Sequence, residues 1–132
     1  MATNITNKEK VIYPELSYLL MGILFEVHNK LGTKYQEKHY QKAVSVALKA
    51  NGLQLQEQKP IKLVYKDAPI GIYYMDFLIE DKIILEIKRK EYFSKNNIQQ
   101  VYGYLKTAGL RLGILANLTS KGLQFKRIVN EV

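Results

Sequence analysis

Apolar residues spaced three and four apart mark the first part of the chain as helical. From Pro14 onward this spacing is kept up to Leu31, and Gly32 then supplies a stop signal. The pattern returns over residues 35–50 and is closed by the Asn51-Gly52 pair. We therefore expect two consecutive amphipathic helices.

The rest of the chain is dominated by short apolar runs that are typical of strands. Extended segments are expected at residues 53–58, 61–65, 71–79, 82–88, 111–116 and 123–129. Turns are expected at residues 66–69 and at the Glu80-Asp81 pair, which would close a hairpin. Ser94 can cap a third helix over residues 95–108, which Gly109 ends. Because this helix joins two strands that can lie parallel, the pattern predicts an α/β protein with a mixed sheet.

Length and composition predict one domain. With 132 residues and 47% hydrophobic content, the chain can build one core but not two. Residues 13–132 are expected to form this domain, and residues 1–12, which are polar, a flexible lead-in without the apolar run of a secretory signal. No stretch has the roughly 18 apolar residues of a membrane span. The absence of cysteine excludes disulfides and thiolate metal sites, and a cytoplasmic location is expected.

The charge of the chain favours a polyanionic partner. The formal net charge is +8 and the sequence pI is about 9.5, and nucleic acid is the commonest polyanion that such a protein meets. A basic surface that only keeps the protein soluble is the alternative. Arg89, Lys90 and Lys95 follow the acidic strand ends described next, which favours contact with a phosphate backbone.

Candidate chemistry lies on the predicted hairpin. Glu86 and Lys88 are two apart on a strand, so they share a face, whereas Ile87 points to the core. Asp76 is directly opposite Glu86 only if a three-residue loop closes the hairpin; a two-residue loop would put the acids on opposite faces. Two such carboxylates, joined by the backbone carbonyl of Ile87, could hold Mg²⁺ or Mn²⁺, with the ammonium of Lys88 beside an attacking water.

Both flanking helices carry polar residues that fit this site. Glu37 falls on the apolar face of the second helix, where a carboxylate needs a partner such as a second metal ion or a metal water. Gln100 and Tyr104 are four apart on the third helix, so an amide and a phenol could face a phosphate. Four tyrosines near the proposed site could stack on bases: Tyr73, Tyr74, Tyr92 and Tyr102.

These residues together resemble the GxxExxY family of the PD-(D/E)XK nuclease-like superfamily. The resemblance rests on Glu37 with Tyr40, Asp76 ten positions before Glu86-Ile87-Lys88, and Gln100 with Tyr104. It covers residues 16–129 and implies a restriction-endonuclease-like core of helix, three strands, helix and strand, with an extra N-terminal helix and a C-terminal strand. It also implies a helix-borne acid at Glu37, metal ligands at Asp76 and Glu86, a catalytic lysine at Lys88 and a QxxxY element. Lys34 replaces the first glycine of the family pattern, and Met75 replaces the proline that often precedes the acid.

The leading hypothesis is a nuclease that depends on Mg²⁺ or Mn²⁺ and cuts DNA. Its catalytic residues would be Glu37, Asp76, Glu86 and Lys88, and its substrate contacts Gln100, Tyr104, Arg89, Lys90 and Lys95. The alternatives are a nucleic-acid-binding module that keeps the fold without cleaving, and an interaction protein whose acids and lysine form a structural cluster. A homodimer would let a chain this small grip a duplex, and a partner protein is also compatible with the sequence.

Overall fold

The computed structural model describes residues 12–131. Ile12, the last residue of the predicted lead-in, is buried in the core, and its carbonyl accepts hydrogen bonds from Ser17 Oγ and Arg127 Nη2. The rest of the predicted lead-in lies outside the described residues.

Three helices form where the spacing of apolar residues predicts them. They are α2 (Pro14–Leu31), α3 (Glu37–Ala50) and α4 (Lys95–Ala108). Ser94 caps α4 by accepting a hydrogen bond from the backbone N–H of Asn97, and Gly109 ends it in the left-handed conformation. None of the helices in the described region is long and apolar enough to span a membrane.

Five strands form a single mixed sheet in chain order. They are β1 (Leu55–Tyr65), β2 (Ala68–Ile79), β3 (Ile83–Lys88), β4 (Leu112–Thr119) and β5 (Gly122–Val129). Neighbouring strands are antiparallel except for β3 and β4, which are parallel and joined through α4. The predicted order of elements and the predicted crossover helix are thus confirmed.

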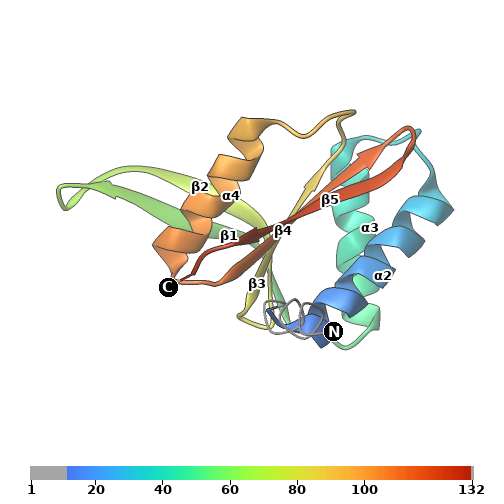
Figure 1. Cartoon of the computed structure of the whole chain (residues 1–132), viewed down its shortest axis with the longest axis horizontal. Helices are drawn as coiled ribbons and strands as arrows, with labels where there is room; N and C mark the ends of the chain where they lie inside the picture. Colours follow the sequence, from blue (N-terminus) through green and yellow to red (C-terminus); the bar gives the residue numbers. More distant parts are fainter. Residues whose placement is uncertain (1–11, 132) are drawn as a thin grey trace, which may run out of the picture.

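The sheet is covered on both faces. Helices α2 and α3 pack on one face and α4 on the other, as Figure 1 shows. Each face therefore has its own hydrophobic cluster, and the side chains of β3 alternate between them: Leu85 and Ile87 face α2 and α3, whereas Ile84 faces α4. Glu86 and Lys88 are two and four residues after Ile84, so their side chains lie on the α4 side of the sheet.

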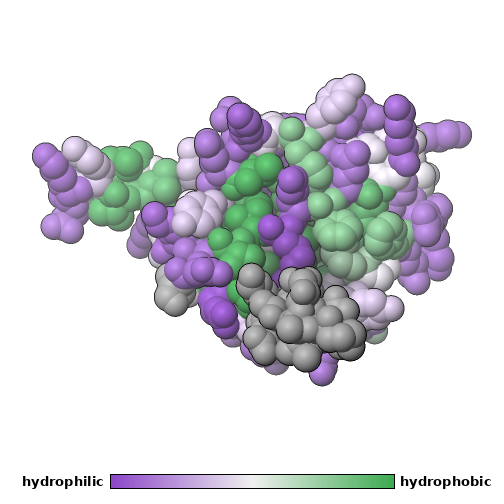
Figure 2. Space-filling model, in the orientation of Figure 1, coloured by the Kyte–Doolittle hydropathy of each residue, from purple (hydrophilic) through white to green (hydrophobic). Residues whose placement is uncertain are grey.

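The far ends of β1 and β2 form an arm that stands clear of the body (Figures 1 and 2). Its tip is the turn Lys66-Asp67, in which both residues have positive φ angles of 48° and 66°. Val64, Ile70 and Ile72 are exposed on the arm and give it an apolar surface between hydrophilic residues.

Strand β1 is longer than the sequence pattern predicts. Two segments are expected around Lys59 and Pro60, but a single strand runs through them. The physical reason is that β1 is an edge strand, so the missing N–H of proline leaves no gap in an interior ladder.

Candidate active site

The hairpin of β2 and β3 has the register that places the two acids opposite each other. Ile79 pairs with Ile83 across the three-residue loop, and the ladder continues to the pair Phe77 and Leu85. Extending this register by one position, beyond the last pair of the ladder, sets Asp76 opposite Glu86. The three-residue loop that the nuclease hypothesis requires is present, with positive φ angles at Glu80 and Asp81.

The backbone ladder gives way to side-chain contacts at this pair. The N–H of Asp76 donates to Glu86 Oε2 over 2.6 Å, and the N–H of Ile87 donates to Asp76 Oδ2 over 2.8 Å. Each carboxyl group thus accepts a backbone N–H from the opposite strand. This exchange fixes both acids at the point where β2 and β3 separate.

Burial makes this pair of acids costly to ionise together. Asp76 is 8% exposed and Glu86 is 3% exposed. Burial, and after it the charge of Asp76, raises the pKa of Glu86 to about 8. Burial also raises the pKa of Asp76, against the opposing effects of the Ile87 N–H and the charge of Lys88. In the absence of a cation, the pair therefore retains a proton at neutral pH.

Lys88 supplies the positive charge of the site. It is half-buried at the end of β3, on the same face as Glu86, and its charge lowers the pKa of both acids. Ile87 between them is fully buried in the core, as predicted. Since N–H and C=O of one residue in a strand point the same way, the carbonyl of Ile87 is directed toward β2 and Asp76.

Helix α3 reaches the acids through an amide that the sequence pattern does not single out. Gln41 Nε2 donates to Asp76 Oδ1 over 3.2 Å. Gln41 is one turn after Glu37, so both project from the same face of the helix toward the ends of β2 and β3. The spacing from Glu37 is the signal that could have identified Gln41.

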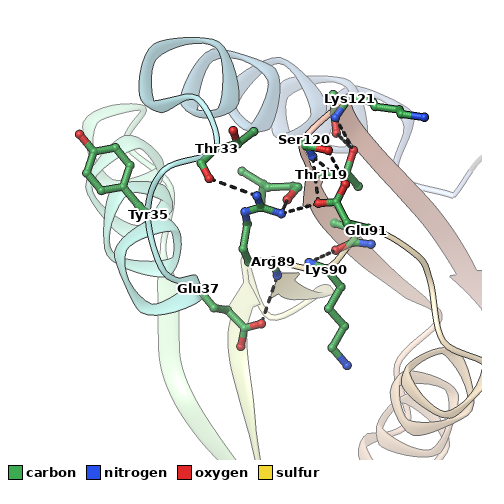
Figure 3. A network of polar contacts seen from close by, with 12 residues as sticks. Thr33, Tyr35, Glu37, Arg89, Lys90, Glu91, Thr119, Ser120 and Lys121 are labelled. Carbon is green, nitrogen blue, oxygen red and sulfur yellow. Dashed lines mark hydrogen bonds and ion pairs between the residues drawn. The ribbon is translucent and has the colours of Figure 1, made fainter.

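Glu37 does not join the acid pair in the way the sequence predicts. Its Oε1 instead accepts the backbone N–H of Arg89 over 3.2 Å (Figure 3). No group of three or more acidic or histidine side chains close enough to hold a metal ion occurs within residues 12–131. The predicted convergence of three carboxylates is therefore corrected to a pair, with Glu37 outside it and near enough for its charge to raise the pKa of both acids.

Gln58 on β1 is a second amide that the sequence did not reveal. By register it lies opposite Asp76, between the pairs Glu57 with Phe77 and Lys59 with Met75. Its side chain helps to lower the pKa of Asp76. Its φ angle of 50° puts a residue other than glycine in the left-handed region, a strained conformation of the kind that clusters at functional sites.

Arg89 is directed into the protein and holds three segments together. Its guanidinium donates to the carbonyls of Thr33 and Leu118, and it forms an ion pair of 2.8 Å with Glu91. Glu91 in turn accepts hydrogen bonds from the backbone N–H and the hydroxyl of Ser120 (Figure 3). These contacts lower the pKa of Glu91 to about 2, the hydroxyl of Ser120 having the largest effect. The Arg89 guanidinium is thus engaged by the protein itself, and Arg89 acts as a clamp that joins the end of β3 to Thr33 and Leu118.

Arg89→Ala is expected to lower the free energy of unfolding by about 2 kcal/mol, because it leaves two carbonyls without their charged donor. Urea denaturation measures this change. Arg111→Ala, which removes an exposed arginine, is the matched control and is expected to stay within ~0.5 kcal/mol of the parent. Equal midpoints for the two variants would show that the clamp contributes nothing to stability.

The remaining predicted substrate residues lie between the end of β3 and helix α4. Lys90 Nζ donates to Asn97 Oδ1 over 3.3 Å, and its backbone N–H donates to Asn117 Oδ1 on β4. Lys95 is exposed at the first turn of α4. Both lysines thus lie on the side of the sheet where Glu86 and Lys88 emerge.

Helix α4 carries the predicted amide and phenol, and its Tyr104 lies near the acids. Gln100 is half-buried and Tyr104 is 4% exposed. Burial, followed by the charge of Glu86, raises the pKa of Tyr104, which keeps the phenol protonated as a hydrogen-bond donor. The helix lies close to β4 at Gly113, where an added Cβ would come within 2.6 Å of Val101 Cγ1. This close approach sets the height of Gln100 and Tyr104 above the sheet.

The donor set at the acid pair fits a hard divalent cation. Two carboxyl groups that repel each other, and a backbone carbonyl directed to the same side, are all oxygen ligands. Mg²⁺ commonly uses one or two carboxylates and completes its shell with water and phosphate oxygens. The pair is therefore sufficient without Glu37.

A mixed sheet between helices, with an acid on each of two antiparallel strands and a lysine two residues after the second, defines a nuclease-like fold. The family model described as the PD-(D/E)XK nuclease superfamily matches residues 14–128. This chain belongs to that superfamily.

A similar arrangement of the backbone is found in the crystal structure of SSO0001, with a TM-score of 0.50 and 16% sequence identity. The match covers 93% of this chain and 80% of that one. At this identity the likeness concerns the fold alone. No curated protein sequence gives a significant match.

Proposed function

We propose that this protein is a nuclease that hydrolyses phosphodiester bonds in DNA with the help of Mg²⁺ or Mn²⁺. The single observation that carries the proposal is the buried pair of carboxyl groups, in which Glu86 accepts the N–H of Asp76 and Asp76 accepts the N–H of Ile87, with Lys88 two residues after Glu86. A structural cluster would pair each acid with a cation. Here two buried acids face each other, and a divalent ion would relieve their repulsion.

Asp76 and Glu86 would hold the divalent cation, which when bound would supply Lewis acidity to the phosphate and to the attacking water. Lys88 orients the attacking water through its ammonium group and stabilises the negative charge that develops on the phosphorus centre. Gln41 holds the carboxyl group of Asp76 in place through its amide.

Substrate is positioned from the helix above the sheet. Gln100 and Tyr104 donate hydrogen bonds to oxygens of the scissile phosphate, and the protonated phenol of Tyr104 adds no charge that would repel it. Lys90 and Lys95 contact flanking phosphates, as the net charge of +8 favours. Glu37 is a positioning residue that acts through the N–H of Arg89.

We also infer that the chain belongs to the GxxExxY branch of the superfamily. Glu37 and Tyr40 support this inference. The hydroxyl of Tyr40 donates to the carbonyl of Gly32 over 2.5 Å, which fastens the loop before α3 and thereby the helix that carries Glu37. Lys34 still departs from the first glycine of the pattern.

Cleavage of labelled DNA tests the proposed function. The purified protein is expected to cut in Mn²⁺ or Mg²⁺ and not in EDTA. Both variants are expected to be folded, with Glu86→Gln inactive and Lys88→Met slowed by about 10²–10³-fold. A parental rate of cleavage in both variants would overturn the proposal. Salt-sensitive binding without cleavage in either metal would instead identify a binding module that retains the fold.

A further inference from the structure

A pocket of about 550 Å³ opens beside the candidate active site, between helix α4 and strands β1 and β2. Four side-chain amides and two phenols contribute to its wall: Asn96, Asn97, Gln99, Gln100, Tyr73 and Tyr104. None of the described residues that line it is charged. Pockets that bind small organic ligands have volumes of about 300–1,000 Å³, and this pocket lies within that range.

The chemistry of this wall differs from that of the rest of the protein. The chain has a net charge of +8, and a phosphate would be met by lysine or arginine, which the wall lacks. Side-chain amides offer a donor and an acceptor together, which is the pattern on the edge of a nucleobase. The amides of Asn96, Asn97 and Gln99 therefore suit a base better than a phosphate, whereas Gln100 and Tyr104 are left for the scissile phosphate.

Two tyrosines connect the pocket with the acids. Tyr104 belongs to the wall and also lies within the field of Glu86. The rings of Tyr73 and Tyr104 meet edge to face, with centroids 5.7 Å apart and an interplanar angle of 61°. Tyr104 is buried, whereas Tyr73 is 43% exposed, so Tyr73 has a ring surface left for a flat ligand.

We propose that this pocket receives the base of an unpaired nucleotide next to the scissile phosphate, with the base stacked on Tyr73 and its edge read by the amides of Asn96, Asn97 and Gln99. A base within a duplex is stacked and paired and must be extruded at a free-energy cost before it can enter the pocket, whereas a base in a single strand or a frayed end enters without that cost. The preferred substrate is accordingly single-stranded DNA. This inference rests on the proposed function, since it places the phosphate of the same nucleotide at Asp76 and Glu86.

Binding of three labelled DNAs tests the pocket: a short oligothymidine, an abasic strand of the same length, and a blunt duplex. Fluorescence anisotropy of the whole protein in Ca²⁺ is expected to show about tenfold tighter binding of oligothymidine than of the abasic strand. Tyr73→Ala is expected to remove this difference. Tyr74→Ala is the matched control, because Tyr74 is the next residue on β2, is 56% exposed and is not part of the wall.

Gln99→Ala provides a second variant if Tyr73→Ala does not fold, because Gln99 is exposed on α4 and its loss leaves the core intact. It is expected to reduce the preference for oligothymidine severalfold. Equal binding of the abasic and base-bearing strands, or a preference that both variants retain, would overturn the inference.

The two proposals fail in different ways. Cleavage of DNA without any preference for a base would overturn the pocket and leave the nuclease assignment in place. A base preference without cleavage would overturn the nuclease assignment and leave the pocket in place. Absence of both binding and cleavage would overturn both.

Discussion

Replacing Glu86 with glutamine is expected to stabilise the metal-free protein at alkaline pH while removing nuclease activity. The pKa of Glu86 is about 8 in the folded protein, whereas in the unfolded chain it has the ordinary value of 4.5. A raised carboxyl pKa contributes stability that is fully present below about pH 4.5 and is lost as the pH rises to about 8. Above that pH the ionised carboxyl group is buried beside Asp76.

The Glu86→Gln variant has no carboxyl group to ionise at this position. Its free energy of unfolding should therefore exceed that of the parent by an amount that grows between about pH 4.5 and 8 and then levels off at a few kcal/mol. Urea denaturation in EDTA at pH 5, 7 and 9 measures the difference. Glu26→Gln, at a side chain that is 65% exposed, is the control and should follow the parent at every pH.

Parallel stability curves for the parent and Glu86→Gln would mean that Glu86 is ionised at ordinary pH in the folded protein. Burial and the charge of Asp76 would then fail to oppose ionisation of Glu86, and a cation would have no unfavourable charge to relieve. Glu86→Gln is expected to raise stability and to abolish cleavage. This combination is typical of a functional residue and not of a buried polar residue that serves stability.

Lys88→Met is expected to lower the rate of cleavage by about 10²–10³-fold, which is the usual effect of removing a group that stabilises charge in the transition state. Because Lys88 contacts water and phosphate in the proposed site and is no ligand of the ion, the affinity for Mn²⁺ should change far less. Single-turnover cleavage at saturating DNA separates the chemical step from binding.

The matched control for Lys88 is Lys126→Met, which removes the same charge from an exposed position on β5. It accounts for the general loss of attraction to DNA. A rate for Lys88→Met equal to that of Lys126→Met would exclude a catalytic role for Lys88. A large decrease in Mn²⁺ affinity would show that the lysine supports the ion site rather than the reaction.

Much of the fold could be predicted because local signals and tertiary packing agree. The spacing of apolar residues and Gly32 predict α2, the cap at Ser94 and the stop at Gly109 predict α4, and both helices have the expected bounds. Helix α3 begins at Glu37 rather than at Tyr35, because Gln36 stays extended and donates its N–H to His39 Nδ1. That contact depends on backbone geometry, which the periodicity of the sequence does not report.

The acid pair could be predicted because its position depends on one short loop. Once the loop after Ile79 has three residues, strand alternation places Asp76 opposite Glu86. The partners of the acids could not be found in this way. Gln41 and Gln58 reach Asp76 from two other elements, and such contacts depend on how α3 and β1 pack on the sheet.

Arg89 and Glu37 make contacts that their positions in the sequence do not indicate. Both are charged residues close to the predicted site, and sequence position alone favours a role in substrate or metal binding. Glu37 accepts the N–H of Arg89 where β3 ends, and the Arg89 guanidinium donates to the carbonyls of Thr33 in the loop before α3 and of Leu118 on β4. Charge near a site therefore does not distinguish a clamp from a contact to substrate.

Titration of the protein with Mn²⁺ by calorimetry tests the central claim most directly. The account predicts that the parent binds the ion, that binding at pH 7 releases a proton from the acid pair, and that Asp76→Asn and Glu86→Gln each abolish or greatly weaken binding. Unchanged Mn²⁺ affinity in these two variants, or no binding by the parent, would contradict it.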